Sequence, residues 1–151
     1  MAEIIISDTS CLIAYQRIDR LDILQKLFHE VIITEQVLSE FGYAVPEWIK
    51  VKSAPPPFSH SILETLDLGE ASSISLALKT PGSILILDER KGRKVATDLG
   101  LEIIGSIRVL LLAKDKKIIP SVREMVDQLS EHKFRFSTHV VRQLLIEAGE
   151  A

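Results

Sequence analysis

The sequence lacks several features that would indicate particular classes of protein. A single cysteine, Cys11, in 151 residues excludes an internal disulfide framework, and the four histidines show no zinc-site spacing. Positive charge is not in excess, because 18 lysines and arginines stand against 21 acids and give a net charge of −3. Proteins that bind polyanions through bulk charge are usually strongly basic, so this class is disfavoured. Aromatic residues make up 5%, too few for a surface that stacks base after base.

Long hydrophobic runs are also missing. The longest nearly uncharged stretch, Ile103–Ala113, contains Arg108 and is too short to span a bilayer. The N-terminus has an acid at position 3 and does not resemble a signal peptide. We therefore expect a soluble, cytoplasmic protein without membrane association. A hydrophobic share of 46% with 26% charged residues is typical of a globular chain, here one domain over residues 1–151.

Short apolar runs alternate with helical patterns, as in a parallel sheet covered on both faces. The runs that predict strands are Ile4–Ile6, Val31–Ile33, Ile49–Val51, Ile84–Leu87 and Ile103–Ile104. Helical spacing predicts helices over Leu21–Phe28, Val37–Phe41 and Ala71–Thr80, and from Ser137 onward. Thr34 is a candidate N-cap, and Ser61 with Glu64 and Ser121 with Glu124 fit capping boxes. This order predicts a three-layer α/β domain.

Two acids stand where chemistry is expected. Asp8 follows the first predicted strand, and Asp88, with Glu89 beside it, follows the fourth. Open α/β sheets bind ligands at the carboxyl edge of their strands. If the first and fourth strands are neighbours, the two carboxylates face each other and repel unless a cation such as Mg²⁺ or Mn²⁺ lies between them. Asp8 has a simpler alternative role, because Asp-Thr-Ser is also good helix-capping chemistry.

Five segments, taken in order, resemble the motifs of the PIN-domain nucleases. They are Asp8–Ser10, Thr34–Glu40, Leu68–Ala77, Ile84–Ala96 and Gly105–Lys114. The third, with its Gly-Glu-Ala, and the fourth are similar to the form found in a compact prokaryotic branch, and many such proteins are toxins of the VapC type. Two positions depart from the commonest pattern: Glu70 stands where Asp is more usual, and Ile86 replaces the Thr of a Thr-x-Asp motif.

The resemblance implies a five-stranded parallel sheet in the order 3-2-1-4-5. It also implies a metal-dependent endoribonuclease, often the toxin of a toxin–antitoxin pair, with RNA and an antitoxin protein as partners. The acids that it assigns to binding Mg²⁺ or Mn²⁺ and to catalysis are Asp8, Glu40, Glu70 and Asp88. Glu70 also has a structural explanation, since a carboxylate is favoured in the first turn of a helix.

Polar and basic residues near these acids are candidates for substrate binding. Thr9 and Ser10 could orient a phosphate oxygen or a water molecule, or could cap the helix that follows. Four cations follow Asp88 closely at the start of a helix: Arg90, Lys91, Arg93 and Lys94. Phosphate contacts there would position an RNA backbone without reading its sequence. The alternative is a solvated helix face.

Other functions remain open. A PIN-like module could bind RNA or a protein without cutting. A phosphoacceptor receiver needs an Asp after the third strand, where Val51–Ser53 supplies none. Nucleotide binding on a Rossmann-like sheet requires a glycine-rich loop, which this sequence lacks. A pure interaction module could use Val140, Val141, Leu144 and Leu145 as the seam of a homodimer, although these residues could equally be core.

Overall fold

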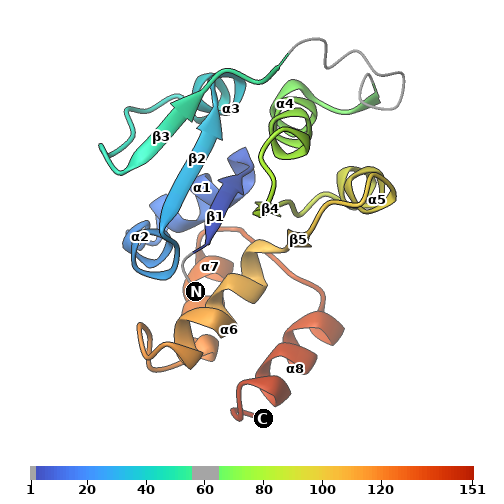
Figure 1. Ribbon diagram of the computed structural model, residues 1–151. Coiled ribbons are helices and arrows are strands. Elements are labelled where there is room, and N and C mark those ends of the chain that lie inside the picture. The colour runs from blue at the N-terminus through green and yellow to red at the C-terminus, as the bar shows by residue number, and fades with distance from the viewer. Residues whose placement is uncertain (1–2, 56–64) are drawn as a thin grey trace.

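The computed structural model describes residues 3–55 and 65–151, and these form a five-stranded parallel sheet with helices on both faces (Figure 1). The strands are β1 (Ile4–Ser7), β2 (Glu30–Thr34), β3 (Ile49–Lys52), β4 (Ser83–Ile86) and β5 (Ile103–Ile104). Their order is β3-β2-β1-β4-β5, as the resemblance implied. β1 therefore pairs with β4, and the residues that follow these two strands meet at the same edge.

Each predicted strand is present with bounds within one or two residues. The end of β4 matters most for the site, because Asp88 follows it. The strand ends at Ile86 and not at Leu87. The Leu87 amide still donates to the Ile104 carbonyl at 3.0 Å, so the extended backbone continues toward Asp88 although the ladder has ended.

Eight helices lie in the described part of the chain. They are α1 (Thr9–Arg17), α2 (Asp22–Leu27), α3 (Glu35–Phe41), α4 (Leu68–Leu78), α5 (Arg90–Asp98), α6 (Ser106–Asp115), α7 (Val122–Glu131) and α8 (Thr138–Glu147). The hydroxyls of Thr34 and Ser121 accept the capping N–H bonds that the sequence predicted, and Ser137, predicted only as a helix start, also caps its helix. The Ser61–Glu64 pair lies outside the described residues. No helix in the described ranges is both long and apolar enough to cross a bilayer.

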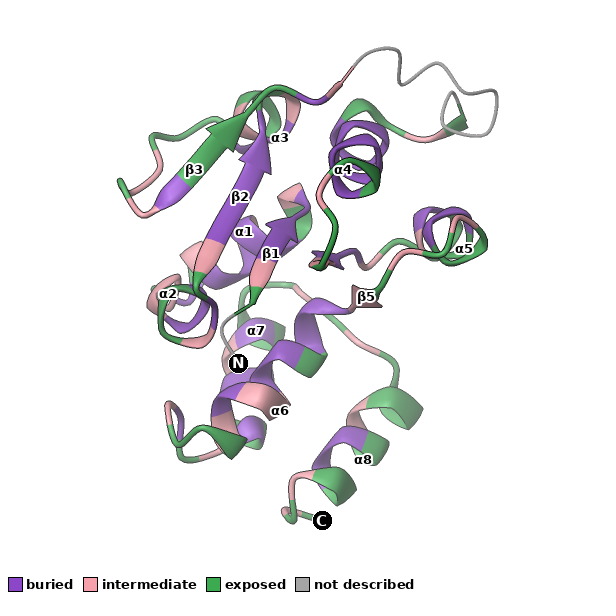
Figure 2. Cartoon of the chain, in the orientation of Figure 1, coloured by how far each residue is buried: buried purple, intermediate pink, exposed green. Residues whose placement is uncertain are grey.

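The sheet separates two apolar clusters. Successive residues of β1 point to opposite faces: Ile5 packs with α1, α2, α6 and α7, and Ile6 packs with α4 and α5. Leu144 and Leu145 of α8 join the first cluster, whereas Val140 is 44% exposed. Figure 2 shows β1 and β2 largely buried and the outer faces of the helices exposed. The arrangement has the predicted three layers.

Three helices end in the same backbone motif. Asp19, Lys117 and Lys133, which follow α1, α6 and α7, adopt left-handed φ values of 56°, 61° and 70°. In each case the next residue donates its N–H back into the last turn of the helix, as Phe134 does to the Leu129 carbonyl at 2.9 Å. Glycine is the usual residue at this position because it has no Cβ penalty, so these three side chains stand where the backbone does not favour them.

A buried pair of hydroxyls fixes α3 against α4. Thr34 Oγ1 accepts from the Val37 amide at 3.1 Å and lies 2.8 Å from Ser72 Oγ, and both side chains are fully buried. Ser72 Oγ also donates to the Gly69 carbonyl at 3.1 Å, which leaves Thr34 as the donor to Ser72. This chain of bonds sets the relative position of the two helices that carry Glu40 and Glu70.

We predict that Thr34→Val lowers the free energy of unfolding by about 1–3 kcal/mol, because the buried Val37 N–H loses its acceptor and the buried Ser72 hydroxyl loses its donor. Urea unfolding measures the change. Thr97→Val on the exposed face of α5 is the matched control and should stay within about 0.5 kcal/mol of wild type. Equal stability of the two variants would contradict the proposed role of Thr34.

Candidate active site

Asp8 stands at the centre of the carboxyl edge of the sheet. It follows β1 directly and caps α1, with Oδ1 accepting from the Cys11 amide at 2.9 Å. Its Oδ2 accepts from the Asp88 amide at 3.3 Å, which ties the ends of β1 and β4 together. The residue is 4% exposed. Asp8 is thus a helix cap and a site residue at once, and the cap of α1 is Asp8 rather than Thr9 or Ser10.

The charge on Asp8 is unfavourable in this position. Burial, followed by the negative charge of Asp88, raises the pKa of Asp8 from 3.8 to about 7. The N–H bonds from Cys11 and Asp88 act in the opposite direction but do not cancel the effect. A bound cation would favour the ionised form of this carboxylate.

Glu40 is held by two donors. Its Oε1 accepts from Thr9 Oγ1 at 2.7 Å, and its Oε2 accepts from the Gly69 amide at 2.9 Å. Glycine is required for this approach, since a Cβ at position 69 would overlap Glu40 Oε1. Thr9 therefore orients an acid of the site.

Glu70 lies in the first turn of α4 and is 9% exposed. Its Oε2 is buried and has no hydrogen-bond partner within the described residues. A Cβ at Gly92 would lie 2.7 Å from that oxygen, so the glycine in α5 makes room for the longer glutamate side chain. Burial, then the hydrogen bond and charge of Asp67, raise the pKa of Glu70 to about 8.

These acids surround one small pocket of about 90 Å³, lined by Asp8, Thr9, Ser10, Glu40, Asp67, Glu70 and Glu89. Asp67 and Glu89 also cap helices, since their side chains accept N–H bonds at the starts of α4 and α5. Asp67 was not among the acids predicted from the sequence. Its position before Leu-Gly-Glu does predict a helix N-cap. A capping pattern alone does not indicate that the side chain lines the same pocket as Asp8 and Glu70.

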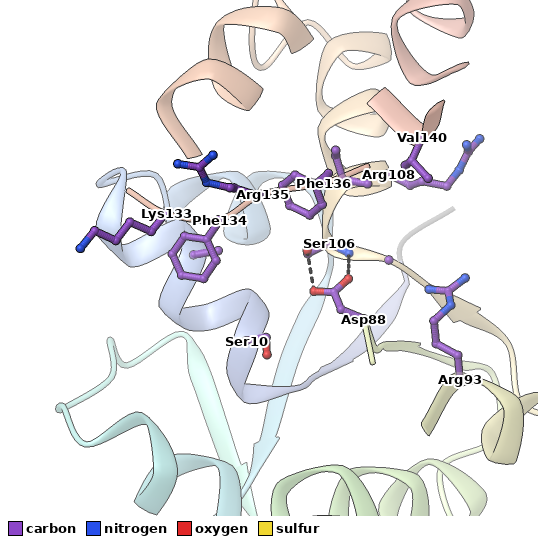
Figure 3. Close-up of a pocket in the computed structure, with 13 residues that line it drawn as sticks. Ser10, Asp88, Arg93, Ser106, Arg108, Lys133, Phe134, Arg135, Phe136 and Val140 are labelled. Carbon is purple, nitrogen blue, oxygen red and sulfur yellow. Dashed lines mark hydrogen bonds between the residues drawn. The ribbon is translucent and has the colours of Figure 1, made fainter. Parts of the chain in front are cut away.

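Asp88 is placed differently from the other three predicted acids. Its Oδ1 accepts from the Ser106 amide at 2.8 Å and its Oδ2 accepts from Ser106 Oγ at 2.7 Å (Figure 3). It lines a second, larger pocket of about 640 Å³. The structure thus brings Asp8, Glu40 and Glu70 around one pocket and sets Asp88 beside them, joined to Asp8 through its backbone.

Of the four basic residues after Asp88, one lines the larger pocket and three are exposed on α5. Arg93 donates from Nη1 to the Leu87 carbonyl at 2.8 Å and lines the larger pocket. Lys94 forms an exposed ion pair with Asp98 at 3.2 Å, and Arg90 and Lys91 are exposed on α5.

The donor set around the small pocket fits a divalent cation. Carboxylate oxygens are the ligands that Mg²⁺ and Mn²⁺ prefer, and Glu70 Oε2 is a buried oxygen without a donor. Within residues 3–55 and 65–151, however, no three His, Cys, Asp or Glu side chains are arranged closely enough to hold a metal ion as they stand. Both carboxylate oxygens of Asp8 and of Glu40 already accept N–H or hydroxyl bonds, so a cation at this pocket would compete with those donors.

A five-stranded parallel sheet in this order with acids at its carboxyl edge defines a nuclease-type α/β fold. A family model described as a PIN domain matches residues 4–150, and the chain therefore belongs to the PIN-domain family. Members of this family are generally nucleases and typically use divalent metals. A search of curated proteins finds no match.

The raised pKa of Glu70 predicts how stability depends on pH. Between pH about 4.5 and about 8 the folded chain keeps a proton that the unfolded chain has lost, so stability falls as pH rises through this window. Glu70→Gln removes the ionisable group and should raise Tm at pH 8, without metal, by about 2–4 °C, the equivalent of about 1 kcal/mol. The gain should vanish near pH 4.

Glu102→Gln on the surface is the matched control for this measurement and should leave Tm unchanged. Loss of stability in Glu70→Gln at both pH values would show that the carboxylate is well accommodated, contrary to our interpretation.

Proposed function

We propose that this protein is a metal-dependent endoribonuclease that hydrolyses RNA phosphodiester bonds with Mg²⁺ or Mn²⁺. The observation that carries the proposal is the convergence of five carboxylates, including the buried Asp8 and Glu70, on one pocket at the carboxyl edge of the sheet. Burial and neighbouring carboxylates raise the pKa values of Asp8 and Glu70, and a bound cation would favour the ionised form of both groups.

In this proposal each residue has a distinct task. Asp8, Glu40 and Glu70 would hold the cation, with Asp88 as the fourth acid beside them. When bound, such a cation supplies Lewis-acid chemistry, activating water and offsetting negative charge on the phosphate. Thr9 keeps the Glu40 carboxylate oriented, and Asp8 and Glu70 give up their protons as the cation binds.

A second candidate is a PIN-like module that binds RNA or a protein without cutting it. The observation in its favour is the engagement of both Asp88 oxygens by Ser106. An Asp88 carboxylate that stays bound to Ser106 would leave only three of the four predicted metal-site acids, Asp8, Glu40 and Glu70, at the small pocket. The cleavage assay described next separates the two functions.

We predict that wild type cleaves single-stranded RNA in Mg²⁺ or Mn²⁺ and that EDTA abolishes cleavage. Asp8→Asn, Glu70→Gln and Asp88→Asn should each lower the rate by about 100-fold or more, because each removes charge from the site. Glu102→Gln should cleave like wild type. Cleavage that survives both EDTA and these substitutions would show that the acids are not catalytic.

Binding of the metal has its own readout. Saturating Mn²⁺ at about 100 times its Kd should stabilise wild type by about 2.7 kcal/mol in thermal unfolding at pH 8. The effect should shrink at pH 5, where protons compete for Asp8 and Glu70, and in Glu70→Gln. If Mn²⁺ stabilises the protein and RNA stays intact, the binding module is the correct function.

We further propose that the protein acts as the toxin of a toxin–antitoxin pair and forms a homodimer. The first part is supported by the Gly-Glu-Ala motif of the VapC-like branch, and the second by apolar exposure on α8. Val140 and Ile146 are 44% and 54% exposed there, while Leu144 and Leu145 are core.

For the homodimer, we predict that wild type sediments as a dimer and that Ile146→Glu sediments as a folded monomer. Leu78→Glu, which alters a 44% exposed apolar residue on α4, is the control and should remain dimeric. A monomeric wild type at micromolar concentration would contradict the homodimer.

A further inference from the structure

The larger pocket beside the acidic site is lined by a segment between α7 and α8 for which the sequence predicted no role. Residues Lys133–Phe136, with the sequence Lys-Phe-Arg-Phe, connect α7 to α8 and line this pocket together with Asp88 and Ser106 (Figure 3). Ser10 lines both this pocket and the small acidic one, so the two are contiguous. A segment far from the acids in sequence therefore faces the same edge of the sheet.

The cations of this pocket are not equivalent. The Arg108 guanidinium is paired with Glu147 through bonds of 2.9 and 3.1 Å, and Arg93 donates to a backbone carbonyl. Lys133 and Arg135 are exposed, and their side chains make no hydrogen bond or ion pair with the part of the chain that the structure describes. These two cations are free to bind an anion that enters the pocket.

Two phenylalanines alternate with these cations. Phe134 and Phe136 are half-buried and pack on the main apolar cluster, and Arg17 lies over the Phe134 ring at 5.1 Å. The rings are thus held by the core while they still contribute to the pocket wall. A volume of about 640 Å³ is within the range of about 300–1,000 Å³ usual for small-molecule sites, which suits a nucleotide unit and not a duplex.

We propose that this pocket binds a nucleotide of single-stranded RNA next to the bond that is cut. Lys133 and Arg135 contact the phosphate, and the Phe134 and Phe136 rings contact the base. The inference rests on the proposed ribonuclease function and adds to it the residues that would hold the substrate strand. Bases of a duplex are stacked inside the helix and cannot reach aromatic side chains, whereas an unpaired base can.

The placement also answers an electrostatic difficulty. A chain with a net charge of −3 and an acidic pocket repels RNA at the point where it must react. The free cations Lys133 and Arg135 would bind the backbone first, in a pocket that shares Ser10 with the acidic one. Phosphate contacts of this kind position the strand without reading its sequence.

The chain offers a matched pair of variants to test this. Lys133 and Lys117 both occupy the left-handed position after a helix, with φ values of 70° and 61°. Lys117 lies at the opposite end of α6 from Ser106, about 15 Å along the helix axis. Lys133→Gly and Lys117→Gly remove the same charge, and glycine suits both backbones, so neither variant should lower Tm.

Binding is measured by fluorescence anisotropy with a labelled single-stranded RNA of about 12 nucleotides, in EDTA to prevent cleavage. We expect Lys133→Gly to weaken binding about threefold to tenfold and to lower the slope of log K against log salt by about 0.7. Lys117→Gly should bind like wild type. Arg135→Gln should behave like Lys133→Gly, and Phe136→Leu should weaken binding about fivefold or more without changing the salt slope.

The outcomes separate the inference from the proposed function. If wild type cleaves RNA while Lys133→Gly and Lys117→Gly bind it equally well, the pocket is not the subsite and the ribonuclease assignment stands. If wild type neither binds nor cleaves RNA, both are overturned. If duplex RNA of the same length binds as tightly as the single strand, with the same loss in Lys133→Gly, the proposed base contact is wrong.

Discussion

Burial and mutual repulsion of carboxylates at one edge of the sheet are the constraint on which the rest of this structure depends. Parallel strands in the order β3-β2-β1-β4-β5 bring the residues after β1 and β4 to one place, and both chain segments end in acids. Asp8 and Glu70 are the two acids most affected, because both are buried among other carboxylates. Burial is the main reason why the pKa of Asp8 rises to about 7 and that of Glu70 to about 8.

The fold offsets this repulsion with the backbone. Free N–H groups at the start of a helix carry partial positive charge, and four helix starts point at this edge. Each places at least one N–H against a carboxylate of the site. The pairs are Cys11 N with Asp8, Gly69 N with Glu40, Gly92 N with Glu89 and Ser106 N with Asp88. Glu70 is the exception, since its Oε2 receives no bond within the described chain. The position with the least internal compensation is the one where an external cation gains most.

The fold was predictable from the sequence. The division of the predicted acids between two pockets was not. Apolar runs such as Ile4–Ile6 and caps such as Thr34 are local signals, and they identified the elements correctly. Contacts between distant residues leave no such signal. Nothing in the sequence indicates that Asp88 bonds to Ser106, or that Gly92 in α5 makes room for Glu70 in α4. Gly92 explains how the chain accommodates Glu at position 70, where Asp is more usual. The longer acid faces a residue on α5 that has no side chain.

The two pockets divide what a nuclease requires between opposite charges. A cation site needs clustered acids, and a polyanionic substrate needs the reverse, so one pocket cannot provide both at full strength. In this protein the acids gather around Asp8, and the free cations Lys133 and Arg135 line the neighbouring pocket. Glycine at position 133 would satisfy the left-handed turn better but would remove one of these charges. If Lys133 binds substrate as we propose, stability and substrate binding therefore favour different residues at this position.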